Sequence, residues 1–595
     1  MTLLPAPRQL RRKPGILALP RRNPFAWVSI RQTDTAPDHP EAYSLTITPA
    51  GITIEHRDPA GRRAALATLR QLLAQHGRRL PCLVIRDWPA FARRGVMLDV
   101  SRGRVPNLAT LLDLAERLAD FKINELQLYT EHTFAYRKFK SVWQTWGALT
   151  GPEIRRLDAR CRELGIDLVP NQNSFGHLRY FLAHPDLKPL AEIPEPYEAE
   201  TGDFLRRPTT LAPRHPGTLP FLRDCYDELL PNFTSRYFNI GADETWDLGK
   251  GQSQAACARL GQGRVYLTFL KQLHREVTGR GKTMMFWGDI ILKYPDLIAQ
   301  LPRDVIALNW GYEANHPFDR ETAQFARAGI PFYVCPGTST WQTLLGKHDN
   351  ALKNLRAAAQ SGQKHGALGY LVTDWGDGGH PQPLAVSWPL LAAGAAYAWN
   401  PRGVSAATLT AVLNRDLFAD PTHHAARAGF QLGFTHRQLR VSAANETPLG
   451  TVIAAPRPAD RELFCRNGLK WAARISPQHI RAALREIEAR RRALAKSQPR
   501  TAAGKLLVRE LDLAARMAAE SCHYLLWQQA VAASRKSAAT RLARRGLDSL
   551  KNIETEYTRL WPRRNKATPR HSVPFLKWRR AEYLEFLGAS GGTLN

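Results

Sequence analysis

The stretch YFNIGADETWDLG, residues 237–249, begins as a short apolar run and ends in two adjacent carboxylates, Asp243 and Glu244, beside a tryptophan. A strand that carries acids to its own C-terminal end is typical of a parallel α/β barrel, which presents its catalytic groups at that end. The same pattern occurs where a strand enters a polar turn and an acid caps the next helix. The rest of the chain has to separate these two interpretations.

Short apolar runs alternate with helical patterns on both sides of this stretch. Parallel strands need long crossovers, usually helices, so this rhythm predicts a parallel sheet, and eight such units predict a (β/α)8 TIM barrel over residues 91–400. The longest interval contains the Pro- and Glu-rich residues 185–216, which we expect to form a functional loop over the barrel mouth. The eight runs are residues 95–100, 123–129, 166–170, 237–241, 283–287, 305–310, 331–335 and 368–373.

The segments that flank the barrel read differently. Residues 25–90 contain alternating apolar runs, a turn signal at 49–51 and one helical pattern, which predict a small N-terminal α+β domain. Residues 1–24 are basic and contain prolines, and we expect an arm there. Residues 401–595 are predicted to be a mostly helical, basic C-terminal region.

The chain carries a formal net charge of +30. Residues 461–595 hold 28 basic and 11 acidic residues, so this region supplies +17 of that excess. Such an excess favours either polyanion binding or arginine-rich, solvated helix faces. No nucleic-acid motif accompanies the charge, and the basic residues are spread along helices, so we prefer solvated faces and do not expect nucleic acid as a partner.

The chain has no apolar run near the roughly 18 residues that a membrane span needs, so no membrane partner is expected. Residues 1–22 lack the apolar core and small-residue cleavage site of a secretory signal, which favours a cytoplasmic location, with export by another route left open. The seven cysteines are scattered and contain no CxxC pair, which argues against disulfides and a zinc site. No cofactor is predicted, and nothing indicates an oligomeric state.

Tryptophans recur near the ends of the predicted barrel strands, and most of them have a carboxylate close by. Tryptophan rings stack on the C–H face of a sugar, and carboxylates bind its hydroxyls, so the set favours a carbohydrate pocket over simple barrel packing. The residues are Trp246, Trp287, Trp310, Trp341 and Trp375.

Asp243 and Glu244 are neighbours, and neighbouring side chains on a strand point in opposite directions unless the strand end bends. With a bend, one carboxyl lies beside a leaving oxygen and the other lies under the sugar ring. Two close acids also push each other's pKa values apart, which helps one of them to stay protonated as a general acid. Without a bend, only one of the two faces the pocket.

From Arg94 to about Asp377 the chain resembles the family 20 glycoside hydrolases, the β-N-acetylhexosaminidases. The likeness lies in residues 94–102 (RGVMLDVSR), 175–177 (FGH), 241–244 (GADE) and 375–377 (WGD), in that order on the predicted barrel. The small domain before the barrel also fits the architecture of the family. The resemblance covers about half of the chain.

The resemblance implies retaining, substrate-assisted hydrolysis, in which the 2-acetamido oxygen of the sugar attacks the anomeric carbon. This route departs from the usual two-carboxylate scheme of glycosidases, because the substrate itself supplies the nucleophile. Glu244 would be the general acid and base, and Asp243 would orient the acetamide. Sugar contacts would come from a further set, which comprises Arg94 on the ring hydroxyls, Glu131 and His177 from the second and third strands, Trp287, Trp310, Trp341 and Trp375 as walls, and Asp377 on a hydroxyl.

The chain departs from the family at several of these positions. The family commonly has His at the position of Asn239, Gly at Ala242 and Glu at Asp377. Its acetamide-binding tyrosine has two candidates here, Tyr312 and Tyr333. Neither gluco nor galacto preference follows from these residues.

Three alternatives stay open at this point. An ordinary double displacement would use Asp374 or Asp377 as nucleophile. A non-catalytic carbohydrate- or polyanion-binding protein could keep the barrel without turnover. A metal site could be built from His177, Asp374, Asp377 and His380, although their spacing matches no strong ligand motif.

Overall fold

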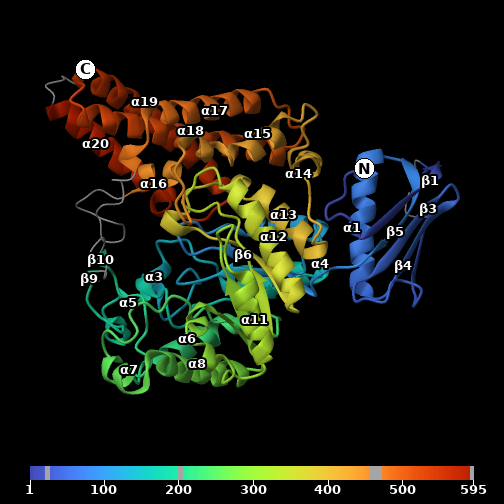
Figure 1. Ribbon diagram of the computed structural model, residues 1–595, viewed down its shortest axis with the longest axis horizontal. Coiled ribbons are helices and arrows are strands. Elements are labelled where there is room, and N and C mark those ends of the chain that lie inside the picture. Colours follow the sequence, from blue (N-terminus) through green and yellow to red (C-terminus); the bar gives the residue numbers. More distant parts are fainter. Residues whose placement is uncertain (21–26, 199–204, 456–471, 590–595) are drawn as a thin grey trace.

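The computed structural model describes residues 1–20, 27–198, 205–455 and 472–589 (Figure 1). It consists of an N-terminal sheet domain, a central barrel and a C-terminal group of helices, as the sequence predicts. Among the described residues, no helix is long and apolar enough to cross a membrane.

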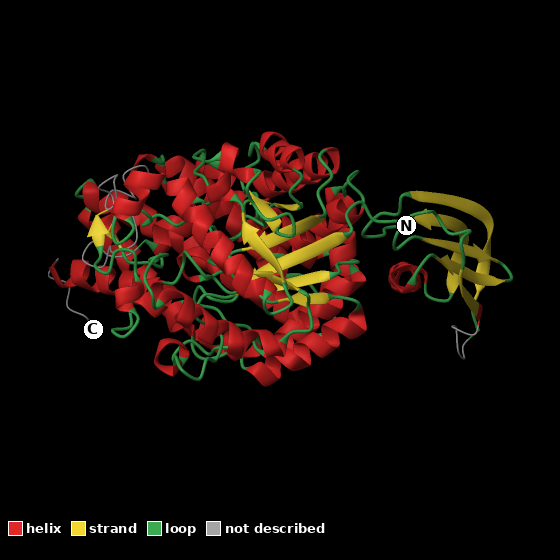
Figure 2. Cartoon of the chain, turned by 90° about the horizontal axis from the view of Figure 1, so that it is seen from below, coloured by secondary structure: helices red, strands yellow, loops and turns green. Residues whose placement is uncertain are grey.

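The N-terminal domain is a five-stranded sheet with one helix, α1 (Pro59–His76), packed on one face (Figure 2). The strand order is β1-β5-β3-β4-β2. Its strands are β1 (Gln9–Ala18), β2 (Val28–Gln32), β3 (Tyr43–Thr48), β4 (Gly51–His56) and β5 (Arg79–Asp87).

One prediction for this domain is wrong. Residues 9–18, expected to belong to a basic arm, form edge strand β1, which pairs antiparallel with β5. Strand β2, which starts at Val28, lies within the range predicted for this domain.

The eight predicted barrel strands are all present, and they form one parallel sheet in the order β11-β12-β13-β14-β15-β6-β7-β8. An isolated bridge between Asn171 and Asn239 joins the two ends, so the sheet nearly closes. The strands are β6 (Arg93–Asp99), β7 (Glu125–Tyr129), β8 (Asp167–Val169), β11 (Tyr237–Asn239), β12 (Thr283–Trp287), β13 (Ile306–Trp310), β14 (Phe332–Cys335) and β15 (Gly369–Asp374).

Helices between the strands surround the barrel, and their apolar faces form one large core with the outward side chains of the strands. They are α2 (Leu108–Asp120), α3 (Lys140–Trp143), α4 (Gly151–Leu164), α5 (Arg179–Leu182), α6 (Thr218–Leu229), α7 (Gln254–Leu260), α8 (Gln262–Thr278), α9 (Asp289–Leu292), α10 (Pro295–Ile298), α11 (Phe318–Ala328), α12 (His348–Lys364) and α13 (Trp388–Trp399).

Buried polar contacts attach the N-terminal domain to the barrel. The Asp87 carboxylate accepts a hydrogen bond from Lys122 Nζ at 2.9 Å and another from Trp399 Nε1 at 2.9 Å. Arg94 reaches Glu41 in the small domain at 2.6 Å. Both contacts use residues near the starts of barrel strands, so the small domain lies away from the strand ends that carry the site.

The C-terminal region is helical and packs against the barrel on a different side from the N-terminal sheet (Figure 1). Its residues reach the loop that follows β15: Tyr557 donates to the Pro381 carbonyl at 2.9 Å and Ser572 to the His380 carbonyl at 2.8 Å. The helices are α14 (Ala406–Leu413), α15 (His424–Leu432), α16 (Pro448–Ala454), α17 (Pro477–Ala495), α18 (Ala502–Ala532), α19 (Lys536–Leu560) and α20 (Phe575–Ala589).

The long connection between β8 and β11 is tied to the loop after β11 by two buried carboxylates. Asp247, in the loop after β11, accepts hydrogen bonds from the Thr210 backbone N–H at 3.1 Å and the Tyr197 hydroxyl at 2.6 Å. Glu192, in the connection between β8 and β11, accepts a hydrogen bond from the backbone N–H of Ser253, in the loop after β11, at 2.8 Å. We call this pair, Asp247 and Glu192, the loop clasp.

Candidate active site

The C-terminal ends of the barrel strands enclose a group of inward-facing side chains. Side chains alternate along a strand, and the inward set includes Met97, Tyr129, Met285 and Leu371. Asp243 and Asp377 lie beyond the ends of β11 and β15, where their carboxylates contact His177 and Arg102 respectively. The predicted strand ends therefore do converge on one site.

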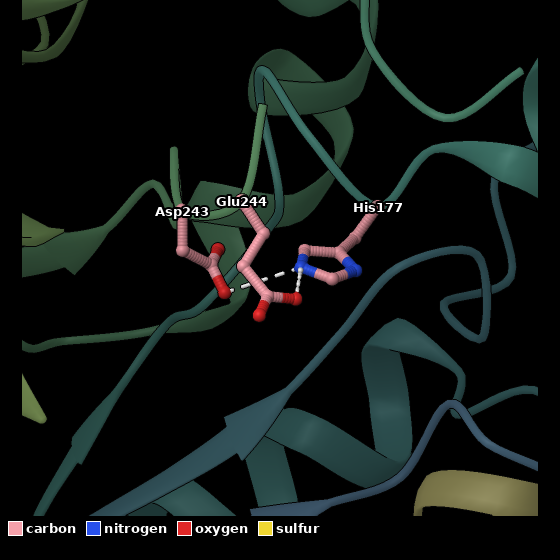
Figure 3. A group of neighbouring side chains, drawn as sticks. All are labelled: His177, Asp243 and Glu244. Carbon is pink, nitrogen blue, oxygen red and sulfur yellow. Dashed lines mark ion pairs between the residues drawn. The ribbon is translucent and has the colours of Figure 1, made fainter. Parts of the chain in front are cut away.

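Asp243, Glu244 and His177 lie together at this end of the barrel (Figure 3). His177 Nε2 is 3.2 Å from Asp243 Oδ2 and 3.4 Å from Glu244 Oε2. The Asp243 side chain is 7% exposed and that of Glu244 is 33% exposed. Both acids thus face the same histidine, with the Asp243 side chain almost buried and the Glu244 side chain partly exposed.

The backbone bends sharply between the strand and this acid pair. Gly241, Ala242 and Glu244 have φ values of +69°, +70° and +48°, in the left-handed region that residues with a Cβ rarely adopt. A Cβ on Gly241 would meet Asn173 Oδ1 at 1.8 Å, so glycine is required there. Asn239 supports the bend because its Oδ1 accepts the Gly241 N–H at 3.0 Å. The bend lets neighbouring acids face one pocket.

Electrostatics favour a charged His177. Burial lowers its pKa, but the adjacent Asp243 and Glu244 carboxylates outweigh burial and raise the pKa well above its ordinary value, against the opposing charge of Arg102. On the opposite edge of the ring, Nδ1 lies 3.3 Å from Arg102 Nη2 and 4.0 Å from Glu131 Oε1. His177 therefore links the acid pair to the end of β7.

Arg102, just beyond β6, lies at the centre of the second half of the site. Its guanidinium is 3.0 Å from Asp99, 3.2 Å from Glu131 and 3.2 Å from Asp377. It also lies over the ring of Trp375, 5.1 Å from the centroid. Arg102 thus brings acids from β6, β7 and the segment after β15 to one point.

The four predicted tryptophans Trp287, Trp310, Trp341 and Trp375 form one aromatic group with Tyr312. Trp375 Nε1 donates to the Tyr312 hydroxyl at 2.7 Å, and Trp310 stacks on the Tyr312 ring at 5.1 Å. Within the described part of the chain, the indole N–H groups of Trp287 and Trp310 are buried and have no hydrogen-bond partner. The group therefore combines apolar aromatic surfaces with two indole N–H groups that make no hydrogen bond within the described residues.

The prediction for Arg94 is wrong. Its side chain is 2% exposed, points outward from β6 and donates to Glu41 and to the Lys122 carbonyl. It also lies at the start of the strand, whereas the site lies at the end. Arg94 attaches the N-terminal domain and does not reach a sugar in the pocket.

Of the two tyrosine candidates, only Tyr312 lies in the aromatic group near the acid pair. The Tyr333 hydroxyl donates to Glu125 at 3.0 Å and receives a hydrogen bond from Arg93, and both of these partners lie at the starts of their strands. Burial raises the pKa of Tyr312 well above its ordinary value, so its phenol stays neutral.

The metal set weighed from sequence does not assemble. The Asp374 carboxylate accepts hydrogen bonds from the Thr338, Thr340 and Ser387 hydroxyls at 2.7–2.8 Å and faces away from the barrel axis. Among the described residues, the one group with ligand atoms within 4.8 Å of one another is His177, Asp243 and Glu244. That group is the acid pair itself with its histidine.

Sequence reasoning missed Arg102 and Asp289 as site residues. Asp289 follows β12, and its Oδ2 accepts the Glu244 backbone N–H at 3.2 Å. Asp289 lies beyond the end of β12, at the first position of α9, so alternation along the strand does not fix its direction. Arg102 lies beyond the regular part of β6, where alternation no longer applies.

Comparison with known families gives two matches along the chain. The model described as Glycosyl hydrolase family 20, catalytic domain, matches residues 91–401, and the one described as Glycosyl hydrolase family 20, domain 2, matches residues 10–88. The first match covers more than half of the 595 residues.

Curated relatives are distant. A beta-hexosaminidase of Akkermansia muciniphila is 30% identical over 226 residues, which cover 34% of this chain and 45% of that protein. A beta-hexosaminidase of Vibrio furnissii is 27% identical over 338 residues, covering 50% of this chain and 52% of that one. The chain thus spans about half the length of the curated relatives it matches.

Solved structures share the fold. The Flavobacterium johnsoniae chitobiase aligns with a TM-score of 0.57 at 17% identity over 96% of this chain and 99% of that chain. The exo β-N-acetylglucosaminidase of Vibrio harveyi in complex with N-acetylglucosamine aligns with a TM-score of 0.55 at 18% identity, over 72% and 78%. With both domain matches in their expected order, the chain belongs to glycosyl hydrolase family 20.

Proposed function

We propose that the protein is a retaining exo-glycosidase that releases terminal β-linked N-acetylhexosamine, GlcNAc or GalNAc, by substrate-assisted catalysis. The observation that carries this proposal is the acid pair, with both carboxylates turned to His177 (Figure 3). The tryptophan group lies at the same ends of the barrel strands. Membership of family 20 supports the same reaction class.

The difference in exposure assigns the two acids to different roles. Glu244 is the more exposed, at the mouth where a leaving group departs, and acts as general acid and then as general base. Asp243 is nearly buried, and its Oδ1 has no hydrogen-bond partner among the described residues. It accepts the acetamide N–H and stabilises the positive charge that develops on that group.

The reaction then has two steps. The acetamide oxygen attacks the anomeric carbon while Glu244 gives its proton to the glycosidic oxygen, so the aglycone leaves and an oxazolinium ion remains. Glu244 next takes a proton from water, which opens the oxazolinium ring and restores the acetamide. Two displacements at one carbon retain the β configuration.

Tyr312 supplies the donor for the acetamide oxygen in this proposal. Its hydroxyl already accepts Trp375 Nε1–H, which leaves its own proton available for donation. Trp287, Trp310 and Trp341 enclose the acetamide and the sugar faces. Their apolar surface favours the acetamide methyl group and excludes water from the reacting atoms.

Arg102, Glu131 and Asp377 bind the remaining sugar hydroxyls. The Asp377 side chain is 39% exposed and pairs with Arg102, so it lies at the accessible side of the site. Arg102 takes the role first expected of Arg94, because its guanidinium presents several donors in a fixed plane.

Two alternatives predict different outcomes. Double displacement through Asp374 is opposed by its burial and its three hydroxyl partners. Double displacement through Asp377 has no such obstacle, and a non-catalytic binding protein would show no turnover at all.

A panel of chromogenic β-N-acetylhexosaminides and their non-acetylated counterparts tests the proposal. We expect turnover of the acetylated substrates alone, inhibition by a thiazoline analogue, and loss of turnover in Glu244→Gln. Glu163→Gln, a 65% exposed side chain on α4, serves as the matched control and stays active. Equal turnover of both substrate classes would contradict the mechanism, and no turnover by the wild type would contradict the activity.

A further inference from the structure

Asp289 is a third carboxyl group beside the acid pair. It lies two residues after Trp287, the last residue of β12, and is the first residue of α9. Its Oδ2 accepts the backbone N–H of Glu244 at 3.2 Å. Its Oδ1 is buried and has no hydrogen-bond partner within the described residues. Asp289 therefore contacts the backbone of the general acid directly.

The backbone at Glu244 needs such support. A glutamate at φ +48° is strained, and Ala242 at φ +70° adds to the strain of the same turn. The Tyr266 hydroxyl holds the Ala242 carbonyl at 3.0 Å, on the side of α8. Asp289 is the acceptor that holds the N–H of Glu244, on the side of β12. The two contacts fix the turn from both sides.

The surroundings of Asp289 favour its protonated form. Burial raises its pKa, the Asp243 and Glu244 carboxylates raise it further, and together they bring the pKa to about 8, although the hydrogen bond from the Glu244 N–H and the charge of Lys293 act in the opposite direction. The Tyr266 phenol, on α8, is kept neutral by burial and adds no charge. At neutral pH the site thus avoids a third negative charge next to the acid pair.

We propose that Asp289 is a positioning residue for Glu244, a side chain whose carboxyl oxygen fixes the backbone of the general acid in the strained turn. The inference rests on the proposed function for the role of Glu244, but the state of Asp289 can be measured without any substrate. A neutral hydrogen-bonding group suffices for this role, so asparagine should replace Asp289 and alanine should not.

The first experiment measures Tm against pH for wild type and Asp289→Asn. An aspartate with a raised folded-state pKa holds a proton that the unfolded chain releases above pH ~4, so the wild type loses stability from this group between pH ~4 and ~8. Asparagine does not titrate. The Tm of Asp289→Asn relative to wild type should therefore rise across that window, while the exposed control Asp296→Asn shows a flat difference. A flat difference for Asp289→Asn overturns a neutral Asp289.

The second experiment measures kcat and KM on a chromogenic N-acetyl-β-glucosaminide at pH 6. Misplacement of a catalytic group by about 1 Å costs roughly 100-fold, so Asp289→Ala should lose ~10- to 100-fold in kcat with little change in KM. Asp289→Asn should stay within about threefold of wild type, since it keeps the acceptor. Wild-type kcat in Asp289→Ala, or equal losses in both variants, overturns the positioning role.

The two experiments separate the failure of this inference from failure of the proposed function. If wild type turns over no N-acetylhexosaminide, the proposed function fails, and the Tm profile still decides whether Asp289 is neutral. If wild type is active and Asp289→Ala does not fold, the same Tm profile and the kcat of Asp289→Asn still decide the inference. A kcat of Asp289→Asn reduced ~100-fold would then count against it.

Discussion

Two arginines, Arg94 near the start of β6 and Arg102 just beyond its end, offer a direct test of the proposed sugar site. Arg102 contacts Asp99, Glu131 and Asp377 at the strand ends, whereas Arg94 contacts Glu41 at the other end of the barrel. Arg102→Lys and Arg94→Lys keep the charge at each position. Both variants replace the planar guanidinium by an ammonium group and change nothing else, so they test the same loss of hydrogen-bond donors at two positions.

The contacts set the size of the expected effect. In the proposed function the planar fork of Arg102 also donates to sugar hydroxyls, and a single ammonium cannot keep that geometry, so we count two hydrogen bonds to the sugar as lost. At about 1.5 kcal/mol for each charge-assisted hydrogen bond, the loss is ~3 kcal/mol, or roughly 100-fold in kcat/KM. Arg94→Lys should lower Tm by loosening the contact with Glu41, with kcat/KM within about threefold of wild type.

The assay is kcat/KM on a chromogenic N-acetyl-β-glucosaminide, with Tm measured for each variant and the kinetics taken well below the lower Tm. Comparable kcat/KM for Arg102→Lys and wild type would refute the assignment of Arg102 to the sugar hydroxyls. A loss of roughly 100-fold in folded Arg94→Lys would instead restore the original expectation for Arg94.

Three further outcomes follow from the site and the loops. Tyr312→Phe should lower kcat about 100-fold on acetylated substrates, because one preorganised donor to the acetamide oxygen is lost; an unchanged kcat would exclude Tyr312. The pKa of His177 is raised in the folded state, so its ion pairs stabilise the fold fully below pH ~6.5. This stabilisation is lost as the pH rises through the folded-state pKa. The Tm of His177→Gln should therefore lie furthest below that of the wild type near pH ~5.5, and the difference should shrink at alkaline pH. Asp247→Asn should expose the 183–217 connection to limited proteolysis, and adding Glu192→Gln should cause less than an additive increase, because both changes open the loop clasp.

The barrel could be predicted from sequence because its strands are buried on both faces and read as continuous apolar runs. All eight runs became strands, including the three-residue β11 that leads into the acid pair. Edge strand β1 was missed for the opposite reason. It contains Arg11, Arg12, Lys13 and Pro14, and nearly all of its residues are exposed, so it carries no apolar pattern. Charges of this kind are typical of edge strands, where they prevent pairing with other chains.

The site was predictable only in part. Two residues on one strand that differ by an odd number point to opposite faces, and Met97 faces inward, so alternation alone places Arg94 outward. Arg102 lies in the turn after the strand, and its direction depends on acids from three different strand ends. The contact between Asp289 and the Glu244 N–H joins two loops 45 positions apart, which no local pattern encodes.

The hydrogen bonds between the C-terminal region and the barrel affect the order in which parts of the fold can form during synthesis. Lys566 and Arg564 bind the segment that follows Arg102, through the Val105 carbonyl and the Asn107 N–H, each at 2.8 Å. All eight barrel strands leave the ribosome long before these partners do. The nascent barrel can pair its strands early, yet the turn beside the pocket obtains its full set of hydrogen bonds only when translation reaches the last helices. The segment that follows Arg102 is therefore completed late in synthesis, when residues 564–566 become available to bind it.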